Sequence, residues 1–175
     1  LKMLMDPSYD VRLDAKIALE QFGTSKEQLV DQFIEALKSR DVGVVLFALR
    51  SLSELATDAG EPKAIDPALT LLGHANEAVR TEAAQVLPQL GSNQDQMVDK
   101  YIELLENRDV GASLFAIRAL AGFNNMKIIP AHLELLNNRN PAVRREAIQT
   151  LNRLGPDLNQ LEKYLQALQH NDVDV

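Results

Sequence analysis

The chain has 175 residues, a formal net charge of −7 and no cysteine. The acidic balance argues against a general nucleic-acid binder, which needs a net basic surface, and the lack of cysteine excludes disulfides and thiolate metal sites. No apolar run approaches the ~20 residues that a membrane helix needs, and no signal peptide is evident, so we expect a cytoplasmic protein.

Two segments of the chain are nearly the same. Residues 40–52 (RDVGVVLFALRSL) and residues 108–120 (RDVGASLFAIRAL) belong to stretches that align without a gap and are identical at 15 of 33 positions. A plainer motif, which opens with Val-Arg and closes with Gly, occupies three further segments: residues 11–23, 79–91 and 143–155. The chain is therefore built from internal repeats.

The five copies recur with a nearly constant period. One alanine stands at the same place in each copy, and these alanines are Ala15, Ala48, Ala83, Ala116 and Ala147. The steps between them are 33, 35, 33 and 31 residues. Such a period is typical of solenoids in which helix pairs stack on a shared core. We therefore predict an all-α superhelix, a solenoid of about five helix-pair repeats, as a single domain over residues 1–175.

A predicted first helix precedes the motif in each repeat. These helices cover residues 25–38, 61–72, 93–106, 126–137 and 158–169. Residues 1–5 are similar to the ends of such helices, and residues 161–173 align with residues 98–110, up to the point where a second helix should begin. Because repeat arrays normally end in polar capping repeats, we expect a fragment of a longer array, cut mid-repeat at both ends, which would self-associate through its exposed ends.

The second helices have recognisable boundary residues. Their predicted N-caps are Ser8, Asp41, Asn76, Asp109 and Asn140. Their predicted C-caps are Gly23, Gly91 and Gly155. Three prolines, which we interpret as bends within helices, are Pro67, Pro88 and Pro130.

Helix pairs of this length, with Asp or Asn before Val-Arg, an alanine expected to be buried and a closing glycine on the second helix, resemble HEAT repeats. The short HEAT-like type of phycobilin lyase subunits is the most similar. The resemblance covers essentially the whole chain. Two copies depart from the motif, because Val45 and Ser113 replace the usual arginine and Gly43 and Gly111 precede them by two residues. It implies an armadillo-like α-solenoid scaffold that holds protein partners on its concave face, and it implies no particular activity.

The outward side of the second helices is the candidate binding surface. On a helical wheel Val11, Ala15, Leu19 and Phe22 face the core, and two intervening positions point away from it. The resemblance implies that these outward positions line the concave side. With the phenylalanines on one flank, the predicted partner-binding residues are Leu13, Ile17, Leu46, Phe47, Arg50, Gln85, Leu114, Phe115, Arg118, Arg145 and Gln149. Apolar side chains beside arginines are typical of protein interfaces. The alternative is that the leucines and phenylalanines only pack and the arginines are solvated.

The other flank carries a series of arginines. Arg12, Arg80 and Arg144 are expected to hydrogen-bond loop or helix-end groups between repeats, which is a structural role. Their place also predicts cation–π contacts with Phe47 or Phe115 of a neighbouring repeat.

No catalytic or metal-binding constellation is evident. His74 and His170 occupy equivalent turns three repeats apart, so they should not share a site. Two carboxylate pairs, expected to be solvated, are Asp31 with Glu35 and Asp99 with Glu103. A phosphate-binding loop and an activated nucleophile are also missing. We therefore expect a non-enzymatic protein without cofactor or metal.

Three alternative functions stay open. An accessory, lyase-type subunit is implied by the resemblance alone, and the chain offers no cluster of histidine and aromatic residues for a tetrapyrrole. DNA binding, as in HEAT-like alkylpurine glycosylases, would use a narrow basic track of Arg50, Arg118, Arg144 and Arg145. A structural spacer within a larger protein would explain the near-identity of two repeats, because a recent duplication needs no ligand.

Overall fold

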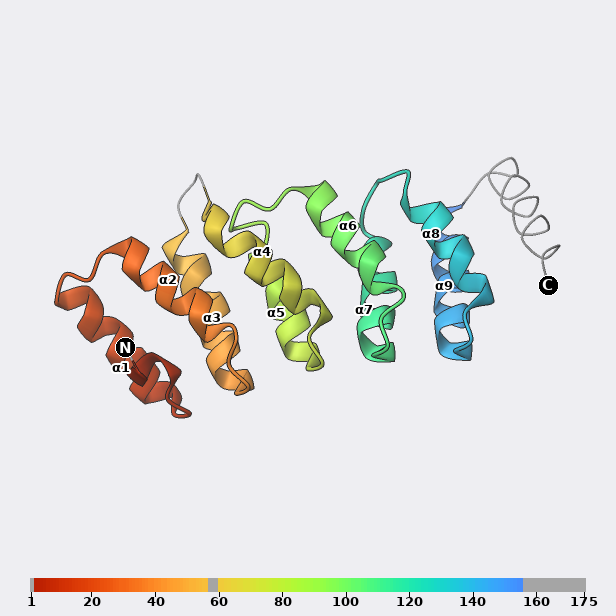
Figure 1. Cartoon of the computed structure of the whole chain (residues 1–175). Coiled ribbons are helices and arrows are strands. Elements are labelled where there is room, and N and C mark those ends of the chain that lie inside the picture. Colours follow the sequence, from red (N-terminus) through yellow and green to blue (C-terminus); the bar gives the residue numbers. More distant parts are fainter. Residues whose placement is uncertain (1, 57–59, 156–175) are drawn as a thin grey trace, which may run out of the picture. The chain divides into compact units, whose positions relative to one another are not determined.

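The computed structural model describes residues 2–56 and 60–155. The secondary-structure elements of these residues are α-helices and short 3-10 helices (Figure 1). These residues belong to two compact units, Leu1–Met97 and Val98–Val175. The helix predicted at residues 158–169 and the predicted turn residue His170 lie outside the described residues. Within residues 2–56 and 60–155, none of the helices combines the length and the apolar character that crossing a bilayer requires.

In the first unit, first and second helices alternate along the chain. The second helices are α1 (Tyr9–Gln21), α3 (Val42–Leu55) and α5 (Glu77–Val86). The first helices are α2 (Lys26–Ala36) and α4 (Pro62–Thr70), which a 3-10 turn at Leu71–Gly73 extends. Another 3-10 turn, Lys2–Met5, packs against α1 and α2. Because α3 packs against α1, α2 and α5, the second helices of this unit lie side by side (Figure 1).

The second unit repeats this arrangement. Helix α6 (Gln94–Leu104) contains the boundary between the units and leads to α7 (Val110–Leu120). Helix α8 (Ile128–Glu134) ends in a 3-10 turn at Leu135–Asn137, and α9 (Pro141–Leu154) follows. Helix α9 packs against α7 and α8. The four predicted first helices that fall on described residues are thus confirmed, to within a few residues at each end.

The alanines that mark the period are buried. Ala48, Ala83, Ala116 and Ala147 have no exposed surface, and Ala15 is 8% exposed. A methyl side chain at this place lets a second helix approach its neighbours closely, and a larger side chain would overpack the contact. The period read from the sequence is therefore the period of the core.

Most of the predicted caps are confirmed. The side chains of Asp41, Asn76, Asp109 and Asn140 accept hydrogen bonds from backbone N–H groups in the first turns of α3, α5, α7 and α9. Ser8 stands at the N-cap of α1, but its side chain makes no capping bond. The three predicted C-cap glycines have positive φ, at +78° for Gly23, +92° for Gly91 and +61° for Gly155. Glycine enters this left-handed region without steric cost.

Three predictions about single residues need correction. Phe22 is 88% exposed, because α1 ends at Gln21 and the helical wheel no longer applies beyond it. Pro88 lies just beyond α5, which ends at Val86, rather than bending it. Leu87 keeps helical backbone angles, but Pro88 has no N–H with which to continue the helical hydrogen bonds. Pro130 lies in the first turn of α8, where no intrahelical hydrogen bond is lost. Pro67 does lie inside α4.

Candidate functional site

The predicted binding residues fall into three groups by exposure. Arg50, Gln85, Arg118, Arg145 and Gln149 are exposed, and so is Ile17, at 42%. Leu13, Leu46, Leu114 and Phe115 are half-buried. Phe47 is buried at 6% exposure, and its ring meets the rings of Tyr9 and Phe33 edge to face. Phe47 therefore belongs to the core, and its placement on the binding surface is corrected.

The remaining residues make up what we call the second-helix surface: the outward side of α1, α3 and α5 in the first unit, and of α7 and α9 in the second. Its main polar feature is an arginine–glutamate pair at the same repeat position in each unit. In the first unit, Arg50 Nη2 of α3 lies 2.8 Å from Glu82 Oε2 of α5. In the second, Arg118 of α7 donates from Nε and Nη2 to the two carboxylate oxygens of Glu146 on α9, both at 3.0 Å.

These pairs have matching environments. The arginine side chains are 58% and 60% exposed, whereas the glutamate side chains are 16% exposed in both. The hydrogen bond from Arg118 lowers the pKa of Glu146, and the hydrogen bond to Glu82 raises the pKa of Arg50. Each ion pair therefore holds an exposed guanidinium beside the neighbouring second helix.

An open hollow of about 540 Å³ lies beside the pair of the second unit. It is lined by Arg118, Glu146, Gln149, Asn152 and Arg153. Arg118 and Gln149 were predicted from the sequence, but Asn152 and Arg153 were not. Asn152 and Arg153 follow Gln149 by three and four residues, a spacing that places them on the same side of α9 and could have identified them.

The arginines of the other flank hold the loops that precede the second helices. Each donates from Nη1 to the carbonyl oxygens six and five residues earlier in the chain. The pairs of acceptors are Asp6 and Pro7 for Arg12, His74 and Ala75 for Arg80, and Asn138 and Arg139 for Arg144. The predicted hydrogen bonds to loop groups are confirmed, although each arginine binds its own loop rather than a neighbouring repeat.

The two copies without this arginine make other contacts at the equivalent position or beside it. Ser113 Oγ donates to the carbonyl oxygens of Leu104, at 3.3 Å, and Asn107, at 3.1 Å. Arg12 lies 5.4 Å from the ring centroid of Phe47, so the predicted cation–π contact is confirmed for this pair. A Cβ at Gly43 would lie 3.1 Å from the capping Oδ1 of Asp41 and 3.4 Å from Arg12 Nη2, so a larger residue would crowd the cap of α3.

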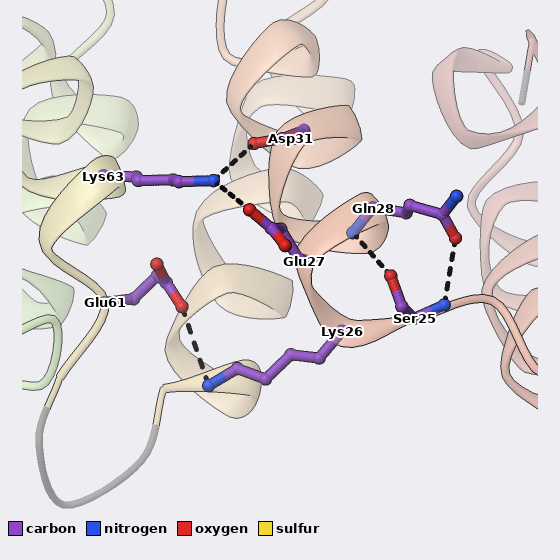
Figure 2. Close-up of polar contacts among 7 residues, drawn as sticks. All are labelled: Ser25, Lys26, Glu27, Gln28, Asp31, Glu61 and Lys63. Carbon is purple, nitrogen blue, oxygen red and sulfur yellow. Dashed lines mark hydrogen bonds and ion pairs between the residues drawn. The ribbon is translucent and has the colours of Figure 1, made fainter.

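The first helices carry a separate layer of ion pairs, shown for the first unit in Figure 2. Lys63 of α4 lies 2.7 Å from Glu27 and 3.6 Å from Asp31, both on α2. Lys26 lies 3.6 Å from Glu61, and Ser25 and Gln28 cap the start of α2 reciprocally. Exposed pairs of this kind stabilise a helix contact only slightly.

The predicted carboxylate pairs belong to this layer. Asp99 lies 2.6 Å from Lys127, and Glu103 lies 2.9 Å from Lys100. Glu35 likewise pairs with Lys38 at 2.5 Å. These carboxylates are solvated and bound to lysines, as expected. Within residues 2–56 and 60–155, no three His, Asp or Glu side chains come together as a metal site would need.

Equivalent hollows also lie between consecutive first helices. One, of about 450 Å³, lies between α2 and α4 and includes Ile34, Leu37 and Leu71. The other, of about 480 Å³, lies between α6 and α8 and includes Ile102, Leu105 and Leu135. The sequence does not indicate these hollows, because they depend on how consecutive first helices pack.

One family comparison agrees with this architecture. A protein-family model described as HEAT repeats matches residues 1–87 and 98–175. No curated protein matches the chain. Among solved structures, a designed armadillo repeat protein is similar at a TM-score of 0.45 and 18% identity, over 95% of this chain and 85% of that chain.

Proposed function

Because the chain belongs to the HEAT repeat family, we propose that it is a non-enzymatic scaffold that holds a partner peptide or protein domain on its second-helix surface. The observation that carries this proposal is the pair of equivalent arginines, Arg50 and Arg118, each exposed and each fixed by a glutamate. Half-buried Leu46 and Leu114 stand four residues before them, one helical turn away.

The chemistry of these positions suits a protein partner. Arginine and apolar side chains are enriched in protein interfaces, and arginine is prominent among the residues that carry binding energy. A guanidinium already held in one orientation loses less conformational entropy on binding than a free side chain. Arg50 and Arg118 are therefore preorganised donors beside an apolar patch, and the same arrangement is available in both units.

Partner capture from native extract tests this proposal. The bait is the whole chain, compared with the Arg50→Gln/Arg118→Gln variant, in which no like-charged pair is created at Glu82 or Glu146. The matched control is Arg40→Gln/Arg108→Gln, which makes the same charge change at equivalent exposed loop positions. Circular dichroism first establishes that all three proteins are equally helical.

We expect the partner to be retained by the original chain and the loop control, and lost by the Arg50→Gln/Arg118→Gln variant. Equal capture by all three would place binding on another surface. Capture by none would favour a structural spacer, in which the arginine–glutamate pairs only tie adjacent second helices together.

A further inference from the structure

In the second unit, the second helices carry a net positive charge. Helices α7 and α9 contain four arginines and one carboxylate, a net charge of +3, although the chain as a whole carries −7. Within residues 98–155, the other carboxylates lie on the first helices, at Asp99, Glu103 and Glu134, or in the loop after α6, at Glu106 and Asp109. The corresponding helices of the first unit, α3 and α5, contain two arginines and three glutamates. The basic surface is therefore a property of the second unit.

This charge is concentrated along one side of α9. Arg145, Gln149, Asn152 and Arg153 are all exposed and follow one another at intervals of four, three and one residues. Such a spacing places them on one side of the helix. Gln149, Asn152 and Arg153 line the hollow of about 540 Å³ together with Arg118 of α7, and Arg145 stands one helical turn before Gln149. Among residues 2–56 and 60–155, no carboxylate forms an ion pair with Arg145 or Arg153.

From this juxtaposition, and resting on the proposed function, we infer that the α9 side of the second-helix surface binds an acidic segment of the partner polypeptide. Arg145 and Arg153 would each meet a carboxylate. They are eight residues apart, which is about 12 Å along a helix. An extended chain advances about 3.3 Å per residue, so the matching carboxylates stand four residues apart in the partner.

The lining of the hollow favours a polypeptide over a nucleic acid. Gln149 and Asn152 present amide oxygens as well as N–H groups, and Glu146 adds carboxylate oxygens. A phosphodiester backbone offers acceptors without donors, so it would leave the amide oxygens of Gln149 and Asn152 unmatched. It would also lie beside the charge of Glu146, whose oxygens already accept from Arg118. A peptide offers backbone N–H groups together with side-chain carboxylates, and so it complements both parts of the surface.

Fluorescence anisotropy with the whole chain tests this inference. The probes are a labelled peptide with glutamates at two positions four residues apart, the same peptide with glutamines, and a single-stranded oligonucleotide of similar length. The variant is Arg145→Gln/Arg153→Gln, and the matched control is Arg108→Gln/Arg139→Gln, which removes two exposed loop arginines of the same unit. Arg145→Gln alone serves as a second variant, because Arg153 also donates to Thr150 Oγ1.

We expect saturable binding of the glutamate peptide and not of the glutamine peptide. The double variant should weaken it about tenfold, consistent with two solvent-accessible ion pairs, and the control less than twofold. Equal effects of variant and control, or no binding of the glutamate peptide, would overturn the inference. Tighter binding of the oligonucleotide, lost in the same variant, would overturn it in favour of a nucleic-acid surface.

The experiments distinguish failure of the acidic-segment inference from failure of the scaffold proposal. If the glutamate peptide does not bind but Arg50→Gln/Arg118→Gln still loses a captured partner, the acidic-segment inference is wrong and the scaffold proposal stands. If that variant retains its partner, the scaffold proposal itself is wrong.

Discussion

Arg144 and Arg145 are neighbours in the chain with different roles. Arg144 is half-buried and donates to two loop carbonyls, at 2.7 and 3.1 Å, whereas Arg145 is exposed. Removal of a charged donor leaves part-buried carbonyls without their partner, which costs about 1–3 kcal/mol. Arg144→Ala should lower the free energy of unfolding by that amount in urea titration. Arg145→Ala should change it by less than about 0.5 kcal/mol, and an equal loss in both would contradict the loop-holding role.

His132 gives the stability of the second unit a dependence on pH. It is fully buried, with Nδ1 2.8 Å from the carbonyl oxygen of Ile128 and Nε2 3.4 Å from that of Ile117. Burial lowers its pKa below the ordinary value, and the nearby charge of Arg153 acts in the same direction. The unfolded chain therefore takes up a proton at higher pH than the folded one, and stability is lost as the pH falls below about 6.5.

The contribution of His132 can be measured by comparing the pH dependence of stability in the original chain and in His132→Gln. Urea unfolding at pH 7 and at pH 5.5 should show a smaller loss of stability on acidification for His132→Gln than for the original chain. The variant is expected to be less stable at both pH values, because it replaces a packed ring. An identical pH dependence in the two proteins would show that His132 does not contribute.

At the scale of one helix, the N-caps of α1 and α3 differ. Asp41 accepts a hydrogen bond from the N–H of Val44 at 3.1 Å, whereas the side chain of Ser8 makes no capping bond. Loss of a cap costs about 1 kcal/mol. Thermal unfolding should therefore show a lower midpoint for Asp41→Ala, and little change for Ser8→Ala. Equal shifts would mean that the cap of α3 contributes nothing particular.

The entry to α4 depends on a glycine packed against the turn that follows α5. Gly60 has φ of +77°, and a Cβ there would lie 2.4 Å from the carbonyl oxygen of Leu90, whereas a Cβ at Gly23, with φ of +78°, would meet nothing within 4 Å. Both substitutions to alanine incur backbone strain of about 1 kcal/mol. Gly60→Ala should cost at least ~1 kcal/mol more, measured by urea unfolding. Equal losses would mean that the backbone at Gly60 shifts freely.

The helices and caps could be predicted because their signals are local. The predictions for Phe22 and Pro88 are wrong because both assume a helix that continues, whereas α1 ends at Gln21 and α5 at Val86. The glutamate partners of Arg50 and Arg118 lie 32 and 28 residues away in the chain. Pairing at such a distance depends on which helices pack side by side, and the same is true of the hollow beside Arg118. The sequence therefore indicated the arginines, but not what holds them.

For the whole molecule, the repeat period predicts one domain, and this stays a prediction beside the two compact units. Each unit carries an exposed arginine and a half-buried glutamate at equivalent repeat positions, so the proposed partner-binding chemistry occurs twice in the chain. The ion pairs of the first helices join the same repeats from the other layer, through Lys63 in one unit and Lys127 in the other. We propose that a partner binds the layer of Arg50 and Arg118.

Site-specific photo-crosslinking in native extract tests whether a partner binds the second helices. A photoreactive amino acid is placed at Gln85 or Gln149, which are exposed on the second helices, and in matched variants at Lys63 or Lys127, which are exposed on the first helices. We predict a crosslinked partner from Gln85 and Gln149 and none from the two lysine positions. Crosslinking from Lys63 and Lys127 alone would contradict the claim and place the partner on the first helices.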